Sequence, residues 1–173
     1  MDGKLDPGRC AEILLADDSE NEAELTRIGF KKSGLRHNLH HVLNGVECLA
    51  FLRKQGEYAK VPAPDLLLLD LNMPIMNGRE VLAEIMSDEN LRSIPVLILS
   101  TSGQDEEILK MYKLGCRSYI VKPVDFNRFL QIVRSLVEYW FNVVVLPSKV
   151  LPGKVPAEEA KAGAGVTLAA TPR

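Results

Sequence analysis

The stretch Ile13-Leu14-Leu15-Ala16-Asp17-Asp18 is an apolar run that ends in two neighbouring acids. A second apolar run, residues 66–69, consists of four leucines and is followed by a third acid, Asp70. Each run is long enough for one buried strand and too short for a membrane span. If the two strands are parallel, their carboxyl ends meet at one edge of the sheet, where open α/β sheets bind their ligands. The sequence therefore predicts three carboxylates gathered at one sheet edge.

Carboxylates that are brought this close together repel one another, and the repulsion raises their pKa values. A bound divalent cation removes the conflict. Mg²⁺ is the hard cation that such oxygen ligands usually hold, and Mn²⁺ is an alternative. We therefore expect Asp17, Asp18 and Asp70 to form a magnesium site.

Strand-like and helix-like segments alternate along the rest of the chain. The expected strands are residues 11–16, 38–42, 66–69, 96–99 and 118–121. The expected helices begin at Ser19 (a capping box with Glu22), Asn44, Asn77, Asp105 and Asp125, and the last one continues through Phe141. Five such βα units predict an α/β fold with a doubly wound, five-stranded parallel sheet.

The composition predicts a single globular domain with short flanking segments. The chain has 173 residues, of which 46% are hydrophobic and 25% are charged, an ordinary balance for such a domain. A net charge of −2 gives no broad basic surface for nucleic acid, and no apolar run suits a membrane helix. We expect a flexible N-terminus at residues 1–8, the folded domain at residues 9–146, and a disordered tail rich in Ala, Gly and Pro at residues 147–173.

The three cysteines, Cys10, Cys48 and Cys116, indicate a reducing compartment. Their number is odd and they form no CxxC pair, so a disulfide framework is not expected. The first residues lack the apolar segment of a secretory signal. We therefore expect a cytoplasmic protein.

Further polar residues follow the later strands, at the same predicted edge of the sheet. Ser100 and Thr101 end the fourth strand, and Lys122 follows the fifth. A carboxylate nucleophile, a metal ion, a hydroxyl group and an ammonium group together suit phosphoryl transfer, which depends mainly on positioning and charge compensation.

These motifs resemble the receiver domain of two-component response regulators, which has the (βα)₅ flavodoxin-like fold also called CheY-like. The stretches that carry the resemblance are residues 13–18, 70–78 (DLNMPIMNG), 99–102 (LSTS) and 119–123 (YIVKP), within about residues 9 to 140. Within the family, the chain is similar to single-domain regulators of cyanobacterial phytochrome histidine kinases. This narrower similarity rests on the insert at residues 56–64, on Ser100-Thr101-Ser102 and on the ending Tyr139-Trp140-Phe141.

The resemblance implies a role for each matched residue. Asp70 would accept a phosphoryl group from a phosphohistidine of a sensor histidine kinase, of the phytochrome type. Asp18 and Asp70 would bind Mg²⁺ by their side chains, Asn72 by its backbone carbonyl, and Asp17 mainly through water. The phosphoryl-binding and switch residues would be Ser100, Thr101, Tyr119 and Lys122, and the loops would be shaped by Pro74, Gly78 and Pro123. The protein would then be a phosphorylation-controlled switch and not a metabolic enzyme.

The end of the last expected helix is more apolar than one core-facing stripe requires. Trp140, Phe141 and Val143 carry the excess. Because an exposed apolar patch often marks an interface, we expect a homodimer through the fourth helix, the fifth strand and the fifth helix. Output would pass by protein contacts to a downstream target. The alternative is that this extension folds back onto its own domain.

Two other functions stay open at this point. Each motif alone has an ordinary structural explanation, such as a helix cap or a turn. One is an aspartyl-nucleophile phosphatase of doubly wound fold, but haloacid-dehalogenase-like enzymes of this kind have a second acid two positions after the nucleophile, as general acid, where this chain has Asn72. A receiver-fold scaffold that is never phosphorylated would not need the acids together with Ser100 and Lys122.

Overall fold

The computed structural model describes residues 9–147. The predicted flexible N-terminus (1–8) and all but the first residue of the predicted tail (147–173) lie outside the described residues. One parallel sheet has the strand order β2-β1-β3-β4-β5. Its strands are β1 (Ala11–Ala16), β2 (His37–Val42), β3 (Leu66–Leu69), β4 (Val96–Ser100) and β5 (Ser118–Val121).

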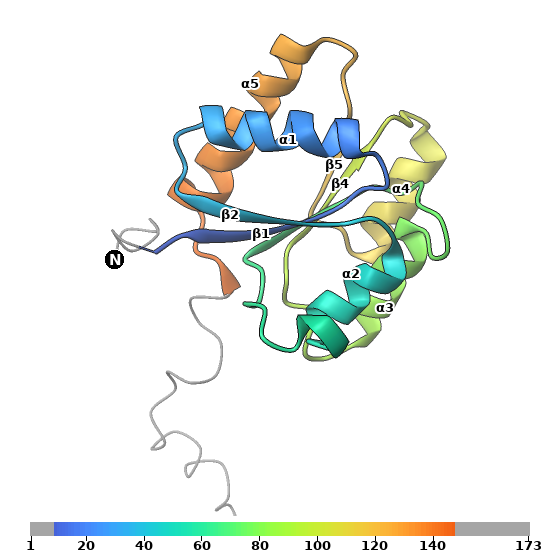
Figure 1. The fold of residues 1–173 in the computed structure, drawn as a ribbon. Coiled ribbons are helices and arrows are strands. Elements are labelled where there is room, and N and C mark those ends of the chain that lie inside the picture. The colour runs from blue at the N-terminus through green and yellow to red at the C-terminus, as the bar shows by residue number, and fades with distance from the viewer. Residues whose placement is uncertain (1–8, 148–173) are drawn as a thin grey trace, which may run out of the picture.

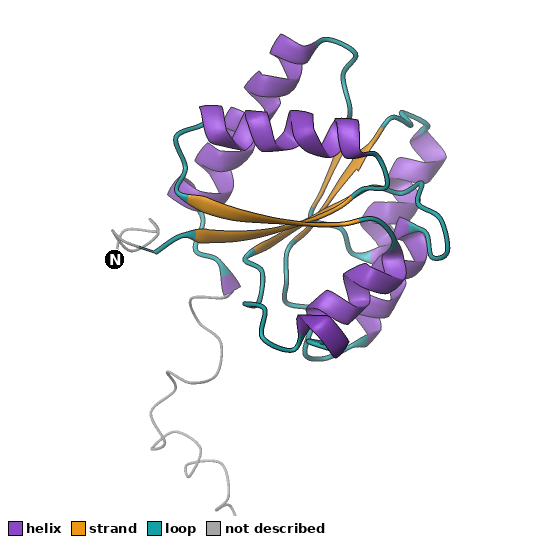
Figure 2. Ribbon diagram, viewed as in Figure 1, coloured by secondary structure: helices purple, strands orange, loops and turns teal. Residues whose placement is uncertain are grey.

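Helices cover both faces of this sheet. They are α1 (Glu20–Lys32), α2 (Gly45–Leu52), the short 3₁₀-helix η1 (Gly56–Tyr58), α3 (Gly78–Ser87), α4 (Asp105–Leu114), α5 (Phe126–Val137) and the π-helix η2 (Glu138–Val143). Helices α1 and α5 lie on one face, and α2, α3 and α4 lie on the other (Figure 1). Figure 2 shows the resulting three layers, with the strands between the helices. The doubly wound α/β prediction is confirmed.

The central strands are buried on both faces. All four leucines of β3 are fully buried. Leu67 and Leu69 contribute to the core beneath α2 and α3, whereas Leu66 and Leu68 contribute to the core beneath α1 and α5. Successive side chains of a strand point to opposite faces, so an uninterrupted apolar run serves both cores.

The strand register brings the carboxyl ends together. Ala16 of β1 pairs with Val42 of β2 and with Leu69 of β3. The amide of Asp70 donates to the carbonyl of Ala16 at 2.9 Å. At the other side of the sheet, the amide of Lys122 donates to the carbonyl of Ser100 at 2.7 Å. The residues that follow β1, β3 and β5 therefore lie along one edge, as the sequence predicts.

The C-terminal segment departs from the single helix predicted through Phe141. Helix α5 ends at Val137 and continues as the wider π-helix η2, closed by a hydrogen bond from the amide of Val144 to the carbonyl of Tyr139 at 3.0 Å. Phe141 and Leu146 are each only 1% exposed and pack in the core beneath α1 and α5. Phe141 was therefore a wrong choice as a dimer-interface residue, because its side chain is buried in its own domain.

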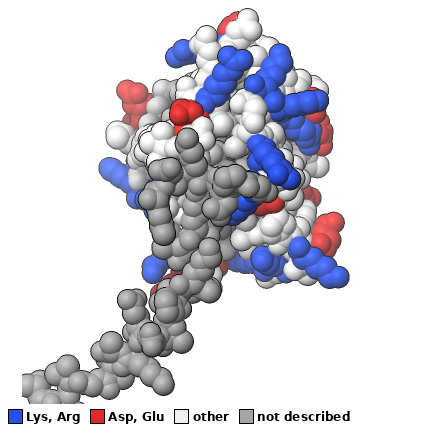
Figure 3. All heavy atoms as spheres, turned by 90° about the vertical axis from the view of Figure 1, so that its left-hand side faces the viewer, with Lys and Arg blue, Asp and Glu red and all other residues white. Residues whose placement is uncertain are grey.

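The surface carries charges of both signs. On the face shown in Figure 3, Lys and Arg side chains lie among Asp and Glu side chains, in keeping with the small net charge of −2. Within residues 9–147, no helix combines the length and the apolar character that a membrane span needs.

Candidate phosphoryl and metal site

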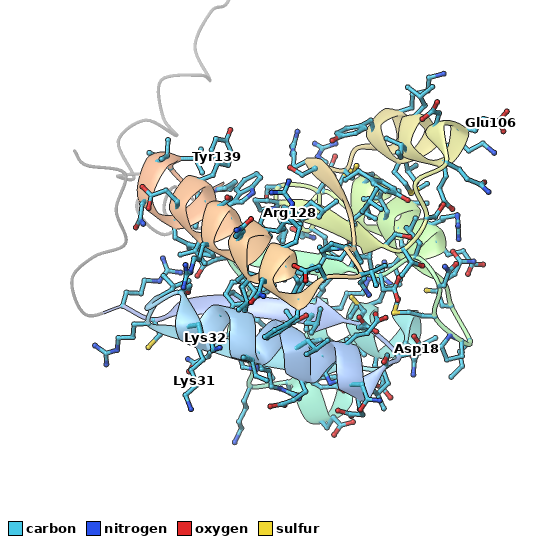
Figure 4. The ribbon with its side chains drawn as sticks, turned by 90° about the horizontal axis from the view of Figure 1, so that it is seen from above. Asp18, Lys31, Lys32, Glu106, Arg128 and Tyr139 are labelled. Carbon is cyan, nitrogen blue, oxygen red and sulfur yellow. The ribbon has the colours of Figure 1, made fainter. Side chains whose placement is uncertain are left out.

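Three acids converge at the carboxyl edge of the sheet. Asp17 and Asp18 follow β1, Asp70 follows β3, and each offers a carboxylate oxygen within 4.8 Å of the others. Asp17 and Asp70 are buried, whereas Asp18 is exposed. Figure 4 places Asp18 at the start of α1, at the opposite end of that helix from Lys31 and Lys32. Three oxygen donors, one of them open to solvent, fit a hard divalent cation that keeps part of its water shell.

The ammonium group of Lys122 partly neutralises the negative charge of Asp17 and Asp70. Its Nζ donates to Asp17 Oδ2 at 2.9 Å, lies 3.7 Å from Asp70 Oδ2, and forms a further ion pair with Glu22 of α1. Burial of the ammonium lowers its pKa, but the hydrogen bonds to Glu22 and Asp17 outweigh burial, and the pKa of Lys122 is raised overall. Lys122 therefore stays charged beside the acids.

Asp70 lies in a poorly solvated position. Burial raises the pKa of Asp70 above its usual value, the charge of Lys122 opposes this rise, and the charge of Asp17 adds to it. One carboxylate oxygen, Oδ1, accepts a hydrogen bond from the amide of Asn72 at 3.3 Å. The other, Oδ2, faces Lys122. One oxygen of Asp70 is thus oriented by the loop, and the other faces the ammonium group of Lys122.

Asp17 is held by the backbone around it and by a neighbouring strand. Its Oδ1 accepts a hydrogen bond from the amide of Ser19 at 2.9 Å. Its backbone carbonyl lies 2.7 Å from Nε2 of His41 in β2, while Arg27 approaches the other ring nitrogen, Nδ1, at 3.3 Å. Since Arg27 can only donate, the imidazole accepts at Nδ1 and donates from Nε2 to Asp17. This contact fixes the turn between β1 and α1.

Two of the predicted switch residues, Ser100 and Tyr119, contact Ser102 in the loop that follows β4. Ser100 is fully buried, and its Oγ accepts a hydrogen bond from the amide of Ser102 at 3.2 Å. The hydroxyl of Tyr119 donates to the carbonyl of Ser102 at 2.9 Å and lies 3.3 Å from Glu107 Oε2. Tyr119 is therefore turned inward beneath α4, against the loop that follows Ser100. Thr101 is exposed.

Gly78 packs closely against the backbone of Asp70. A Cβ atom on Gly78 would lie 2.1 Å from the carbonyl oxygen of Asp70. In the same loop, Ile75 has a φ of +68°, and the amide of Met76 donates to the carbonyl of Pro74 at 2.7 Å, which forms a γ-turn. This geometry supplies a physical reason for a loop-shaping role of Pro74 and Gly78. Pro123 lies with Lys122 in the lining of a cavity between α1 and α5.

Comparison with known proteins identifies the family. Residues 13–134 match the response regulator receiver domain. The chain belongs to this family. It is 38% identical to response regulator Rcp1 of Synechocystis sp., over 79% of this chain and 92% of Rcp1. The predicted resemblance is confirmed, and this response regulator has relatives among the cyanobacterial phytochrome regulators.

Solved structures of receiver proteins share the fold. The phosphorylated cyanobacterial phytochrome response regulator RcpA superimposes with a TM-score of 0.77 at 40% identity, and covers 80% of this chain and 99% of its own. The Mn²⁺-bound form of Rcp1 superimposes with a TM-score of 0.75 at 37% identity, over 79% of this chain and 99% of Rcp1. Receiver domains bind a divalent metal, and the acid cluster of this response regulator fits one.

Two residues of the site, Glu22 and His41, are not evident from the sequence pattern. Glu22 occupies the third position after Ser19, where the pattern predicts a capping box, and a capping box does not place its side chain beside Lys122. His41 lies in a neighbouring strand, and only the register of β1 with β2 reveals that its ring reaches the carbonyl of Asp17. Both contacts depend on how α1, β2 and β5 pack against one another, and no local sequence motif contains this information.

Proposed function

We propose that Asp70 is the phosphoacceptor of this response regulator, with Mg²⁺ as the metal and a phytochrome-type sensor histidine kinase as the phosphodonor. The observation that carries the proposal is the position of Asp70, whose Oδ2 faces Lys122 at 3.7 Å while Asp17 and Asp18 lie beside it. The relatives support the choice of kinase, because RcpA is described as a phosphorylated cyanobacterial phytochrome response regulator.

Each residue of the site would have its own role in phosphoryl transfer. Asp70 attacks the phosphorus atom through Oδ2, and the bond between phosphorus and the histidine nitrogen breaks as the new P–O bond forms. Lys122 compensates the charge on the phosphoryl oxygens. Asp17, Asp18, Asp70 and the backbone carbonyl of Asn72 would hold the cation, which supplies further charge neutralisation when bound. Phosphorylated Asp70 would draw in Ser100, and Tyr119 would close behind it.

The alternative functions are less well supported. A phosphatase of the aspartyl-nucleophile type needs a general acid, which contributes about 10²–10⁴-fold to the rate, and the residue two positions after Asp70 is Asn72. A scaffold that is never phosphorylated gives no reason for a buried Asp70 beside a charged Lys122. We infer a signalling switch without metabolic turnover.

Phosphorylation by a small-molecule donor tests the assignment. The full chain is incubated with acetyl phosphate and either MgCl₂ or EDTA, and the phosphorylated fraction is read on a phosphate-affinity gel. We expect a shifted band only with Mg²⁺, and none for Asp70→Asn. Asp105→Asn, an exposed acid at the start of α4, is the matched control and should be phosphorylated like the wild type. Persistent Mg²⁺-dependent labelling of Asp70→Asn would refute the role of Asp70, and phosphotransfer from a panel of purified sensor kinases would identify the cognate kinase.

We further propose a homodimer through α4, β5 and the α5–η2 segment. β5 is an edge strand of the sheet, and Val121 on it, Tyr139 and Val143 are 44%, 53% and 60% exposed. Trp140 is half-buried against the core of its own domain, and its ring packs edge-on against the exposed Tyr139 at 5.4 Å between ring centroids. An edge strand flanked by exposed apolar side chains is a surface that folded chains tend to cover. A downstream target would use the same face or the surface of α4.

A further inference from the structure

Glu22 is a fourth acid at the site, beside the cluster of Asp17, Asp18 and Asp70. It belongs to the first turn of α1, and its side chain is 40% exposed, whereas that of Lys122 is only 11% exposed. Its carboxylate Oε2 forms an ion pair with Lys122 Nζ, the same ammonium that bonds to Asp17 at 2.9 Å and lies 3.7 Å from Asp70. Of these three acids, Glu22 alone is not part of the metal cluster.

The local structure of α1 leaves the Glu22 carboxylate free for this contact. In a capping box the acid at this position accepts a hydrogen bond from the amide of the cap residue. Here the amide of Ser19 donates to Asp17 Oδ1 at 2.9 Å instead. Ser19 still caps the helix in the other direction, because its Oγ accepts from the amide of Glu22 at 3.3 Å. The helix start is thus satisfied without the Glu22 side chain, which reaches across to Lys122.

Binding of a cation would change the partners of Lys122. A divalent cation on Asp17 and Asp70 withdraws negative charge from the ammonium and adds a positive charge beside it. A largely buried ammonium then needs another partner, because an uncompensated buried charge is costly. Glu22 is the acid that already contacts it from outside the metal cluster.

We propose that Glu22 is a positioning residue for Lys122. It draws the ammonium toward α1 and away from Asp17 and Asp70, so that these acids are available to a cation, and it keeps Lys122 within reach of the phosphoryl group. The inference rests on the metal and phosphoryl site of the proposed function. Without Glu22, Lys122 has only Asp17 and Asp70 as partners, and a cation must displace it from both.

Metal binding tests the proposal without any phosphoryl transfer. Mn²⁺ affinity is measured by calorimetry on the full chain for the wild type, Glu22→Gln, Glu22→Asp and Glu20→Gln. Glu20→Gln is the control, because it removes the same charge from the same turn of α1; the partners of Glu20 are Arg27 at 4.0 Å and His41 Nδ1 at 3.8 Å, and not Lys122. We expect Glu22→Gln to weaken Mn²⁺ binding by about fivefold or more, Glu20→Gln by less than about twofold, and Glu22→Asp to recover most of the loss.

A double-mutant cycle then asks whether Glu22 acts through Lys122. In a Lys122→Met background the ammonium is absent, so adding Glu22→Gln should change Mn²⁺ affinity by less than about twofold. Equal weakening by Glu22→Gln and Glu20→Gln, or additive effects of Glu22→Gln and Lys122→Met, would overturn the positioning role of Glu22. Either result would leave the metal site of the proposed function standing. Failure of the wild-type chain to bind Mn²⁺ or Mg²⁺ would overturn the metal site of the proposed function, and this inference with it.

Discussion

At the scale of single residues, Gly78 shows how a glycine in the loop after Asp70 allows close packing against the Asp70 backbone. A Cβ atom at this position would lie 2.1 Å from the carbonyl oxygen of Asp70 and 2.9 Å from Cα of Leu71, and backbone atoms cannot move aside as a flexible side chain does. We expect Gly78→Ala to lower the free energy of unfolding by about 2 kcal/mol or more and to slow phosphorylation. Urea denaturation measures the first effect, and acetyl phosphate labelling the second.

Gly103→Ala is the matched control for this prediction. A Cβ atom on Gly103 would meet only the side chain of Val121, at 3.8 Å, which is an ordinary contact. This variant should lie within about 0.5 kcal/mol of the wild type. If Gly78→Ala is as stable as Gly103→Ala, the loop after Asp70 has more freedom than the structure indicates.

The buried carboxylate of Asp70 predicts a pH-dependent stability. Burial raises its pKa above the ordinary 3.8, with Lys122 opposing. A raised pKa in the folded state means that Asp70 contributes stability when protonated, fully below its unfolded pKa, and that this contribution is lost as the pH rises through the folded pKa. In EDTA at pH 7, Asp70→Asn should therefore be more stable than the wild type, and the difference should shrink as the pH falls toward 3.8. Urea denaturation across this range measures it, and a difference that grows toward acid pH would contradict the assignment.

The sequence predicts which residues meet at the site where they follow strands directly. It does not predict the residues whose side chains reach the site from another element. Asp17, Asp70 and Lys122 each follow a strand directly, and parallel strands bring their carboxyl ends to one edge whatever the details of packing. Glu22 and His41 reach the site by side-chain contacts between α1, β2 and the loop after β1. Such contacts depend on the distance between packed elements, which a local pattern does not contain. Ser19 followed three residues later by Glu22 predicts a capping box, but in the structure the Glu22 carboxylate forms an ion pair with Lys122.

At the scale of elements, helix α4 buries fewer residues than helix α3, although the two helices have the same length. Helices α3 and α4 each have 10 residues, but α3 buries four of them (Gly78, Val81, Leu82 and Ile85), whereas α4 buries only Met111. Because local opening is easiest where little apolar surface is buried, we expect the amides of α4 to exchange with solvent at least about tenfold faster than those of α3. Hydrogen exchange measured by mass spectrometry on the full chain tests this, and equal protection of the two helices would contradict it.

In the C-terminal segment, the apolar pattern predicts which side chains are buried but not the type of helix that buries them. The spacing of Val133, Val137 and Phe141 predicts one continuous face of a helix, and all three are indeed buried. The change from α-helix to π-helix at Glu138 adds a residue to the turn, and the periodicity of the side chains does not reveal it. The predicted amphipathic face was confirmed, but the assignment of Phe141 to the outer surface was wrong.

Phe141 and Val143 should therefore respond differently to truncation. Phe141 is 1% exposed and packs in the core beneath α1 and α5, whereas Val143 is 60% exposed. Phe141→Ala should lower the free energy of unfolding by about 3–5 kcal/mol, because it leaves a cavity. Val143→Ala should change it by no more than about 0.5 kcal/mol. Thermal or urea denaturation of the monomer distinguishes them, and a small effect of Phe141→Ala would show that η2 is not anchored to the domain.

At the scale of the whole molecule, the proposed dimer needs a test that leaves the core intact. A chain shortened after Glu138 would lose Phe141 and Leu146, which are part of the hydrophobic core, so loss of dimerisation would be confounded with loss of folding. Point substitutions on the exposed surface avoid this problem. Tyr139 lies at the end of the molecule opposite Asp18 (Figure 4), so charges introduced in η2 are remote from the metal cluster.

Val143→Asp should dissociate the dimer without unfolding the chain. A carboxylate buried between two folded chains loses its hydration without a partner, so the dimer dissociation constant should rise by about tenfold or more, which corresponds to about 1.4 kcal/mol. Sedimentation velocity over a range of concentrations, with and without acetyl phosphate and Mg²⁺, measures it. Val46→Asp is the control, because Val46 is also half-exposed but belongs to α2 on the opposite face of the sheet, and it should dimerise as the wild type does. A Val143→Asp chain that sediments like the wild type in both conditions would mean that β5 and the α5–η2 segment face solvent or another partner.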